Sequence, residues 1–277
     1  MGVFQISPID KGGKLFRPSK DCTALIGSDL TPIGFALLYG WKKLGFHTAS
    51  IGLARVSDLD EVMAAAKLIA LEKEGKINLD EMLDGAIDRL NARKEETLGK
   101  EWAEKGLINI PDCYDKDTDG IHIGHILGLH DILASFGMHE YCRDRYISLL
   151  GTKWDKKKTW EERVKAMPGA NPGRSFDSDV DLSEALKNHH NPSLVLQKLK
   201  ETHEWLKDGM SDDELEKRGW KKGYNLTVWT EMPGEIDSRA LQMVLMQTVS
   251  GGRMGSLVET GPGNSFKAEA AQLRLAL

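Results

Sequence analysis

The sequence has few cysteines and no long apolar run. Its three cysteines, Cys22, Cys113 and Cys142, are odd in number and widely spaced, which favours reduced thiols over a disulfide framework or a zinc site. No apolar stretch approaches the roughly eighteen residues needed to cross a bilayer, and the N-terminus reads as a strand and not as a secretory leader. We therefore expect a reducing intracellular compartment, the cytoplasm or an organelle interior. We expect no membrane span, although peripheral association with a membrane complex stays compatible with the sequence.

An excess of charge of one sign is also missing. Lys and Arg number 37 against 42 Asp and Glu, for a net charge of −5, and the charges are interspersed. No basic surface therefore indicates nucleic acid as a partner. Hydrophobic residues make up 40% of the 277 residues, so we expect the chain to bury at least one full core, or two smaller ones.

The N-terminal pattern predicts a β-α-β-α unit over residues 1–75. Two apolar stretches, 3–6 and 47–53, read as strands. The helix between them begins at Thr31-Pro32, with Thr as N-cap and Pro in the first turn, and the next begins at Ser57 in a capping-box pattern. Such a unit favours two parallel strands joined by a right-handed crossover, whose faces and edges need further cover.

Helical periodicity dominates residues 76–219. The apolar spacing predicts helices at 79–107, 121–136, 138–150 and 193–208. Residues 152–183 are rich in Lys, Asp, Gly and Pro and read as a polar loop. The tail, 220–277, has no clear fold beyond a short helix expected at 266–276. The expected fold class is thus mostly α with a small α/β part.

Three segments carry a resemblance to a known family. They are residues 2–13 (GVFQISPIDKGG), 30–32 (LTP) and 50–61 (SIGLARVSDLDE). They resemble the seventh and eighth barrel strands, with their helices, of the aldo-keto reductases, in the branch that carries a helical ferredoxin-like extension. A weaker similarity continues through 98–102 and 141–146. The resemblance implies that the first unit is the remnant of a TIM-barrel end and that 76–219 is the helical extension.

The resemblance also implies a position for the cofactor. In the family, the loop after the seventh strand lies along the cofactor's pyrophosphate, the Arg after the eighth strand contacts the adenosine phosphate, and a following Glu faces the adenine. These roles fall on Ser7, Asp10, Lys11 and Lys14, on Arg55, and on Glu61, respectively. A guanidinium fork suits a phosphate, and a helix N-terminus adds a favourable dipole. Val62 replaces the family's Asn, so we expect weak NADP binding at most.

The catalytic part of the family's barrel is missing from this chain. The family's catalytic Asp, Tyr, Lys and His come from the first four strands, so the resemblance assigns no catalytic residue here. The family's closely spaced cluster cysteines are also lacking, because Cys113 and Cys142 stand 29 residues apart, and no iron-sulfur cluster is expected.

Two functional hypotheses follow from these departures. The first is a degenerate aldo-keto reductase-like protein that serves as a non-catalytic accessory or structural subunit of a larger assembly, with other protein subunits as partners. The alternative is the NAD(P)-binding part of a split aldo-keto reductase, an NAD(P)-dependent oxidoreductase whose catalytic residues another chain supplies. On neither hypothesis is the chain catalytically self-sufficient.

Two further motifs bear on metal binding, and neither predicts a site. Residues 115–120 (DKDTDG) match the first half of a calcium loop, but Ile126 stands at the twelfth position instead of a bidentate Glu. His122 and His125 have the i,i+3 spacing of metal ligands, yet no carboxylate or Cys completes a recognisable set. We expect an Asp-rich helix cap and packed histidines instead.

Overall fold

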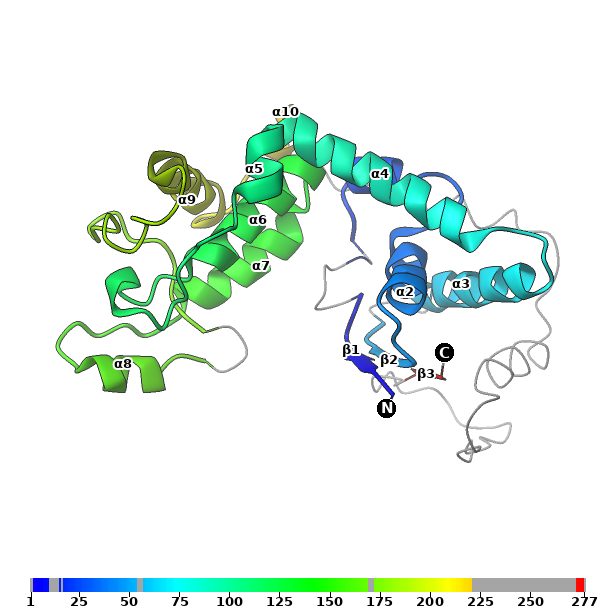
Figure 1. The fold of residues 1–277 in the computed structure, drawn as a ribbon, viewed down its shortest axis with the longest axis horizontal. Coiled ribbons are helices and arrows are strands. Elements are labelled where there is room, and N and C mark those ends of the chain that lie inside the picture. Colours follow the sequence, from blue (N-terminus) through cyan, green and yellow to red (C-terminus); the bar gives the residue numbers. More distant parts are fainter. Residues whose placement is uncertain are drawn as a thin grey trace. The chain divides into compact units, whose positions relative to one another are not determined.

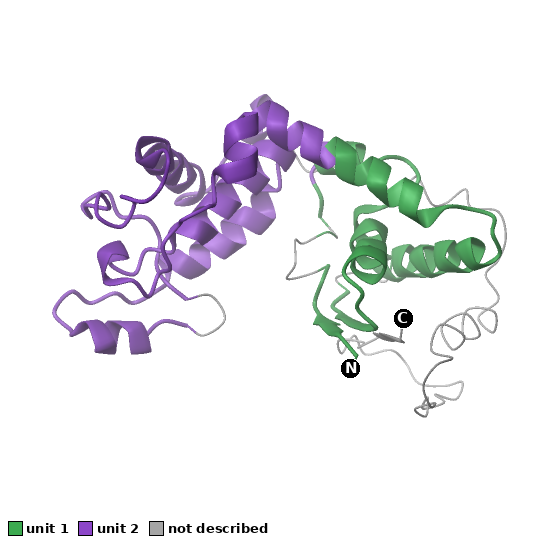
Figure 2. Ribbon diagram, viewed as in Figure 1, with its two compact units in different colours: residues 1–18, 22–89, 223–277 green, residues 19–21, 90–222 purple. Residues whose placement is uncertain are grey.

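The chain forms two compact units, coloured separately in Figure 2. The computed structural model describes residues 2–9, 15, 17–53, 57–168 and 172–220, together with the backbone of a strand at 273–276. The first unit comprises residues 1–18, 22–89 and 223–277, and the second comprises 19–21 and 90–222. The division between the two units falls inside a helix, α4 (Leu79–Leu98).

The first unit contains a small sheet and the helices that follow its strands (Figure 1). Its elements are β1 (Phe4–Ile6), most of α1 (Lys20–Ile26), α2 (Pro32–Lys43), β2 (Thr48–Ile51), α3 (Asp58–Lys73), the first part of α4, and β3 (Leu273–Ala276). The predicted β-α-β-α order is confirmed, with α1 as an additional short helix. Arg89 of α4 holds the end of α1, since its guanidinium donates to the carbonyls of Leu25 and Ile26, each at 2.6 Å.

The sheet has three strands in the order β1-β2-β3. β1 and β2 are parallel, as predicted, with Phe4 opposite Thr48 and Ile6 opposite Ser50. β3 pairs antiparallel with the other edge of β2, with Leu273 opposite Ile51. The helix expected at 266–276 is therefore wrong over Leu273–Ala276, and its residues 266–272 lie outside the described residues. Strand β3 also pairs with one of the two sheet edges that we expected to be open.

Local signals position α2 well. The hydroxyl of Thr31 accepts a hydrogen bond from the Gly34 N–H at 3.0 Å, and Pro32 opens the helix. Gly40 is needed because a Cβ at this position would lie 1.5 Å from a ring atom of Phe46. The helix predicted from Ser57 is confirmed as α3, but the Ser57 side chain makes no cap hydrogen bond, so the capping box expected there is wrong.

The second unit is helical. Beyond the end of α4 its elements are α5 (Lys100–Lys105), a 3₁₀ turn η1 (Lys116–Thr118), α6 (Ile123–Phe136), α7 (His139–Leu150), α8 (Trp160–Lys165), α9 (Pro192–Leu206) and α10 (Asp212–Lys217). The helices predicted at 121–136, 138–150 and 193–208 are confirmed. The long one expected over 79–107 breaks at Gly99, whose φ is 81°, and the polar loop contains α8.

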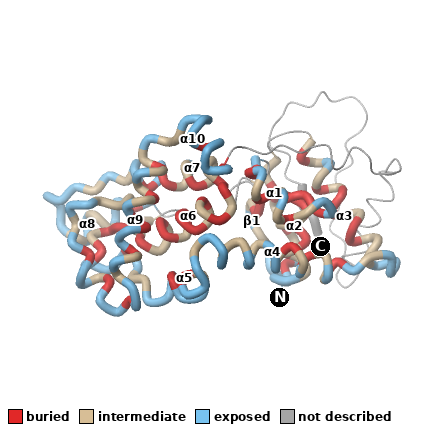
Figure 3. The backbone as a smooth tube through the Cα atoms, turned by 90° about the horizontal axis from the view of Figure 1, so that it is seen from above, coloured by how far each residue is buried: buried red, intermediate tan, exposed pale blue. Residues whose placement is uncertain are grey.

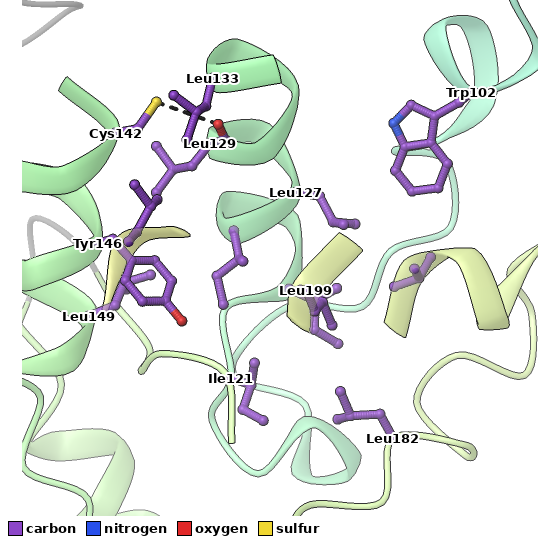
Figure 4. Packing of buried hydrophobic residues seen from close by; sticks show 14 of the residues in the cluster. Trp102, Ile121, Leu127, Leu129, Leu133, Cys142, Tyr146, Leu149, Leu182 and Leu199 are labelled. Carbon is purple, nitrogen blue, oxygen red and sulfur yellow. Dashed lines mark hydrogen bonds between the residues drawn. The ribbon is translucent and has the colours of Figure 1, made fainter. Parts of the chain in front are cut away.

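The core of the second unit surrounds α6, most of which is buried in Figure 3, whereas α5 and α10 are largely exposed. Figure 4 shows side chains of α7, among them Tyr146 and Leu149, facing α6, with Leu199 contributed by α9. The Cys142 thiol donates to the carbonyl of Leu129 at 3.5 Å. Among the described residues, no helix is long and apolar enough to cross a membrane.

Candidate functional site

Two of the residues assigned to the cofactor by resemblance follow the carboxyl ends of adjacent parallel strands. Ser7 comes directly after β1 with φ 55°, and its backbone N–H donates to the Ser50 carbonyl at 2.6 Å. Glu61 lies in the first turn of α3, the helix that follows β2. Ligands of open α/β sheets bind at the carboxyl ends of the strands. Ser7 and Glu61 therefore lie at the end of the sheet where the resemblance predicts the cofactor.

The other assigned residues, Asp10, Lys11, Lys14 and Arg55, lie outside the described residues. Position 62, where the family's Asn would contact adenine, is described. Val62 is only 1% exposed and belongs to the apolar interior of the first unit. The residue at this position therefore serves packing.

The two faces of the sheet differ sharply in burial. The parallel register places Gln5 and Ala49 on one face and Phe4, Ile6, Thr48 and Ser50 on the other. Ala49 and its same-face neighbour Ile51 are buried, whereas Phe4 is 51% and Ile6 70% exposed. From the sequence we expected the side chains of Val3, Ile6, Ala49 and Ile51 to share one barrel-like interior. The structure corrects this expectation, because Ile6 lies on the opposite face from Ala49.

The second unit contains a polar cluster, defined here as Asp131, His130, Lys198 and Glu201, in which the Glu201 side chain is 37% exposed and the other three residues are buried. Asp131 is 6% exposed. Its carboxylate accepts from the Trp102 indole N–H at 3.0 and 3.1 Å and lies 3.1 Å from His130 Nδ1. On the other side of the ring, His130 Nε2 lies 3.3 Å from the Glu201 carboxylate. The cluster thus links α5, α6 and α9.

Lys198 supplies a cation to the same cluster. Its ammonium lies 4.6 Å from the centre of the Trp102 ring, a favourable cation–π position. Burial lowers the pKa of Lys198, while the nearby carboxylates of Asp131 and Glu201 oppose this shift. The Trp205 ring stacks on His130 with ring centres 5.2 Å apart. These hydrogen bonds and ring contacts offset the free-energy cost of burying the Asp131 carboxylate and the Lys198 ammonium.

An Asp-His pair of this kind resembles part of a catalytic relay, but its third member has the wrong chemistry. The ring nitrogen that would activate a nucleophile faces Glu201, a carboxylate, instead of a hydroxyl or thiol. We therefore assign the cluster a structural role. Sequence reasoning did not single it out, although the polar pair His130-Asp131 inside the otherwise apolar α6 was a readable signal.

In the calcium-like motif, residues 115–120, the carboxylate of Asp119 forms ion pairs with two arginines. Asp119, at its fifth position, has one carboxylate oxygen 2.8 Å from the Arg163 guanidinium and the other 2.7 Å from that of Arg174. Arg174 also donates to the Asp119 carbonyl at 2.8 Å, and the Trp154 ring lies against both guanidiniums. Asp119 therefore ties the polar loop to the helical core, and its oxygens are engaged by cations of the chain.

The paired histidines cap α6. The Nδ1 atom of His122 accepts from the His125 backbone N–H at 3.3 Å, and the ring centres lie 5.3 Å apart. Burial lowers the pKa of His125 to about 4, and the neighbouring His122 and Arg145 add to the effect. Burial also lowers the pKa of His122. Within the described residues, no group of three or more His, Cys, Asp or Glu is arranged to hold a metal ion.

The low pKa of His125 predicts acid sensitivity of the second unit. The unfolded imidazole takes up a proton below about pH 6.5, whereas the folded ring resists this until about pH 4, so the free energy of unfolding should fall as the pH drops through this window. We expect a loss on the order of 2 kcal/mol after solvent screening of a partly exposed ring. Urea denaturation at several pH values would measure it.

Replacing the imidazole of His125 with a ring that does not titrate should remove this pH-dependent part of the free energy of unfolding. In His125→Phe, the free energy of unfolding should depend less on pH between about 6.5 and 4 than it does in the parent chain. His190→Gln, at an exposed ring, is the matched control and should follow the parent curve. Identical pH dependence in His125→Phe and the parent chain would contradict the assignment.

The three cysteines are free and buried. Burial raises the pKa of Cys113 to about 12, with a further contribution from Asp112, and it raises the pKa of Cys142 as well. Since the thiolate is the form that attacks electrophiles and binds metals, both thiols are inert at neutral pH. They act as small apolar residues in the core.

Comparison with known proteins adds no relative to this picture. No protein-family model matches the sequence, and no curated protein or solved structure is significantly similar to it.

Proposed function

We propose that the chain is a degenerate aldo-keto reductase-like protein that acts as a non-catalytic accessory or structural subunit of a larger assembly. The observation that carries the proposal is the outer face of the sheet, where Phe4 and Ile6 are mostly exposed. Sheets with parallel strands ordinarily have both faces covered. An apolar strand left open in this way is typical of a surface that another subunit covers.

The chemistry of the described residues agrees with a non-catalytic role. The one Asp-His pair with a relay-like geometry ends on the carboxylate of Glu201, and burial raises the pKa of both Cys113 and Cys142. These groups stabilise the fold and are poorly placed to attack a substrate. An accessory role requires only the folded units and an accessible surface.

The alternative is that the chain supplies the NAD(P)-binding part of a split aldo-keto reductase, with the catalytic residues on another chain. It is supported by the location of Ser7 and Glu61, which follow the carboxyl ends of neighbouring parallel strands. Under this alternative, Arg55 would meet the adenosine phosphate, and Asp10, Lys11 and Lys14 would follow the pyrophosphate.

Purification from the native source distinguishes the accessory subunit from the split enzyme. Sizing with light scattering at moderate salt should give a complex well above the chain mass of 30.8 kDa. Partner chains without an aldo-keto reductase catalytic half would support the accessory role, and a partner that carries that half would support the split enzyme. A monodisperse, folded monomer would contradict both.

Cofactor binding by the isolated chain should be weak. Two loops enclose a dinucleotide far less completely than a whole barrel mouth does, so titration calorimetry with NADP should give a Kd weaker than about micromolar. Tighter binding would favour the split enzyme. In that case Arg55→Ala should weaken NADP more than NAD, because only NADP offers the additional phosphate.

A further inference from the structure

We propose that the start of α6 is an acid-sensitive switch, in which protonation of His122 removes the cap of the helix and frees residues 112–121 while the rest of the helical core stays folded. The inference is independent of the accessory role, because it concerns a conformational change within the second unit. It depends on the acceptor that caps the helix, on the charges around that acceptor and on the segment that the cap holds.

The cap of α6 is made by a group that titrates. Helices are ordinarily capped by Ser, Thr, Asp or Asn, whose side-chain oxygens accept from a backbone N–H of the first turn. Here the acceptor is the Nδ1 atom of His122, which takes the His125 N–H at 3.3 Å. An imidazole accepts through Nδ1 only while that atom carries no proton, and an imidazolium has donors alone. Protonation of His122 therefore cancels the cap.

The position of the two histidine rings makes positive charge unfavourable. Both lie at the N-terminus of α6, the positive end of the helix dipole, and their centres are 5.3 Å apart. The Nε2 atom of His125 is buried and has no hydrogen-bond partner among the described residues, so the doubly protonated ring would leave a donor without an acceptor. Charge on either ring thus favours an open form of the helix start.

Charged groups on the neighbouring segments act on the two rings in opposite directions. Burial lowers the pKa of His122, and the carboxylate of Asp112 opposes this shift. Burial also lowers the pKa of His125, and Arg145 of α7 adds to the shift. Arg174, on the segment beside His122, has its guanidinium engaged by two carboxylates. The closed form therefore resists protonation, whereas the open form takes up protons at the ordinary histidine pKa of about 6.5.

His122 also packs against the segment that precedes α6. A Cβ added at Gly173 would lie 2.8 Å from the Cβ of His122 and 3.0 Å from that of Cys113, so these two side chains meet the chain at the same place. The backbone N–H of His122 donates to the Arg174 carbonyl at 3.1 Å. Loss of the cap therefore loosens the contacts that bury Cys113, which is only 1% exposed.

Thiol labelling as a function of pH tests the proposal on the full chain. Cys113 lies in the segment to be freed, whereas Cys142 is buried in the core around α6. The probe is a pyridyl disulfide, which reacts with thiols in acid, and mass spectrometry reads each cysteine separately. Dividing each rate by that of the urea-unfolded chain at the same pH gives the open fraction at each cysteine.

Acid should expose Cys113 first. The open form binds more protons than the closed form, so the open fraction at Cys113 should rise as the pH falls from about 6.5 to about 4. The rise should be about tenfold per pH unit for each histidine that stays neutral in the closed form. Cys142 should stay protected where Cys113 is already labelled. Equal open fractions at both cysteines at every pH would mean that the whole unit unfolds, and this would overturn the proposal.

An asparagine at the cap separates the role of His122 from general effects of acid. His122→Asn keeps a capping acceptor but takes up no proton, so protection of Cys113 at neutral pH should match the parent chain. The rise of its open fraction in acid should become less steep, by about a factor of ten per pH unit. His190→Gln, at an exposed ring, is the control and should follow the parent chain. An unchanged pH profile in His122→Asn would contradict the proposal.

The tautomer of His122 provides a second test that needs no variant. The nitrogen chemical shifts of the ring at neutral pH should show a bare Nδ1 and a proton on Nε2, because Nδ1 is the acceptor of the cap. A proton on Nδ1 at neutral pH would remove that acceptor and overturn the proposal, even if His122→Asn failed to fold.

Discussion

Replacing Asp131 with alanine should lower the free energy of unfolding of the helical unit by about 3–5 kcal/mol, the usual loss when one member of a buried charge network is removed. The carboxylate accepts from Trp102 and lies beside His130 Nδ1. Without it, the Trp102 indole N–H and the Nδ1 atom of His130 lose their partner in a buried site. Lys198 loses one of the two carboxylates that offset its burial.

Less drastic changes at the same place show which contact matters. Asp131→Asn keeps an acceptor oxygen and the shape of the side chain but removes the charge, so its loss should be smaller than that of Asp131→Ala. Glu95→Ala, at an exposed carboxylate of α4, is the control for removing a negative charge from the unit. If Asp131→Ala and Glu95→Ala had equal, small effects in urea denaturation, the cluster would not hold α5, α6 and α9 together.

The helices of this chain could be predicted where their termini carry local signals. Thr31-Pro32 begins α2 as expected because an N-cap hydroxyl and a first-turn proline act within one turn. The break at Gly99 was missed because the apolar period continues on both sides of a glycine that adopts positive φ. A periodic pattern by itself does not show where the backbone leaves the helix.

Strand β3 and the buried charges depend on distant partners, which limits prediction from sequence. Leu273–Ala276 has a composition that favours a helix, yet pairing with β2, more than two hundred residues earlier in the chain, makes it a strand. His130 and Asp131 look out of place in α6 until Trp102 and Glu201 approach from other helices. Of the cofactor residues taken from the resemblance, the described structure locates Ser7 and Glu61, and the roles of both stay predictions.

Asp119→Ala should have the second largest effect, a loss of about 3 kcal/mol in the free energy of unfolding, because two guanidiniums lose their shared carboxylate. Arg174 is buried. It would keep its ion pair with Asp177, at 3.0 Å, and its hydrogen bond to the backbone carbonyl of residue 119, but it would lose the Asp119 carboxylate. Since Asp119 ties the polar loop to the core, limited proteolysis should cut residues 152–168 sooner in the variant.

The matched control is Asp117→Ala, two residues earlier in the same motif, where the carboxylate is exposed and the change in the free energy of unfolding should stay within about 0.5 kcal/mol. Equal stability and equal cleavage rates for the two variants would show that Asp119 does not fix the loop.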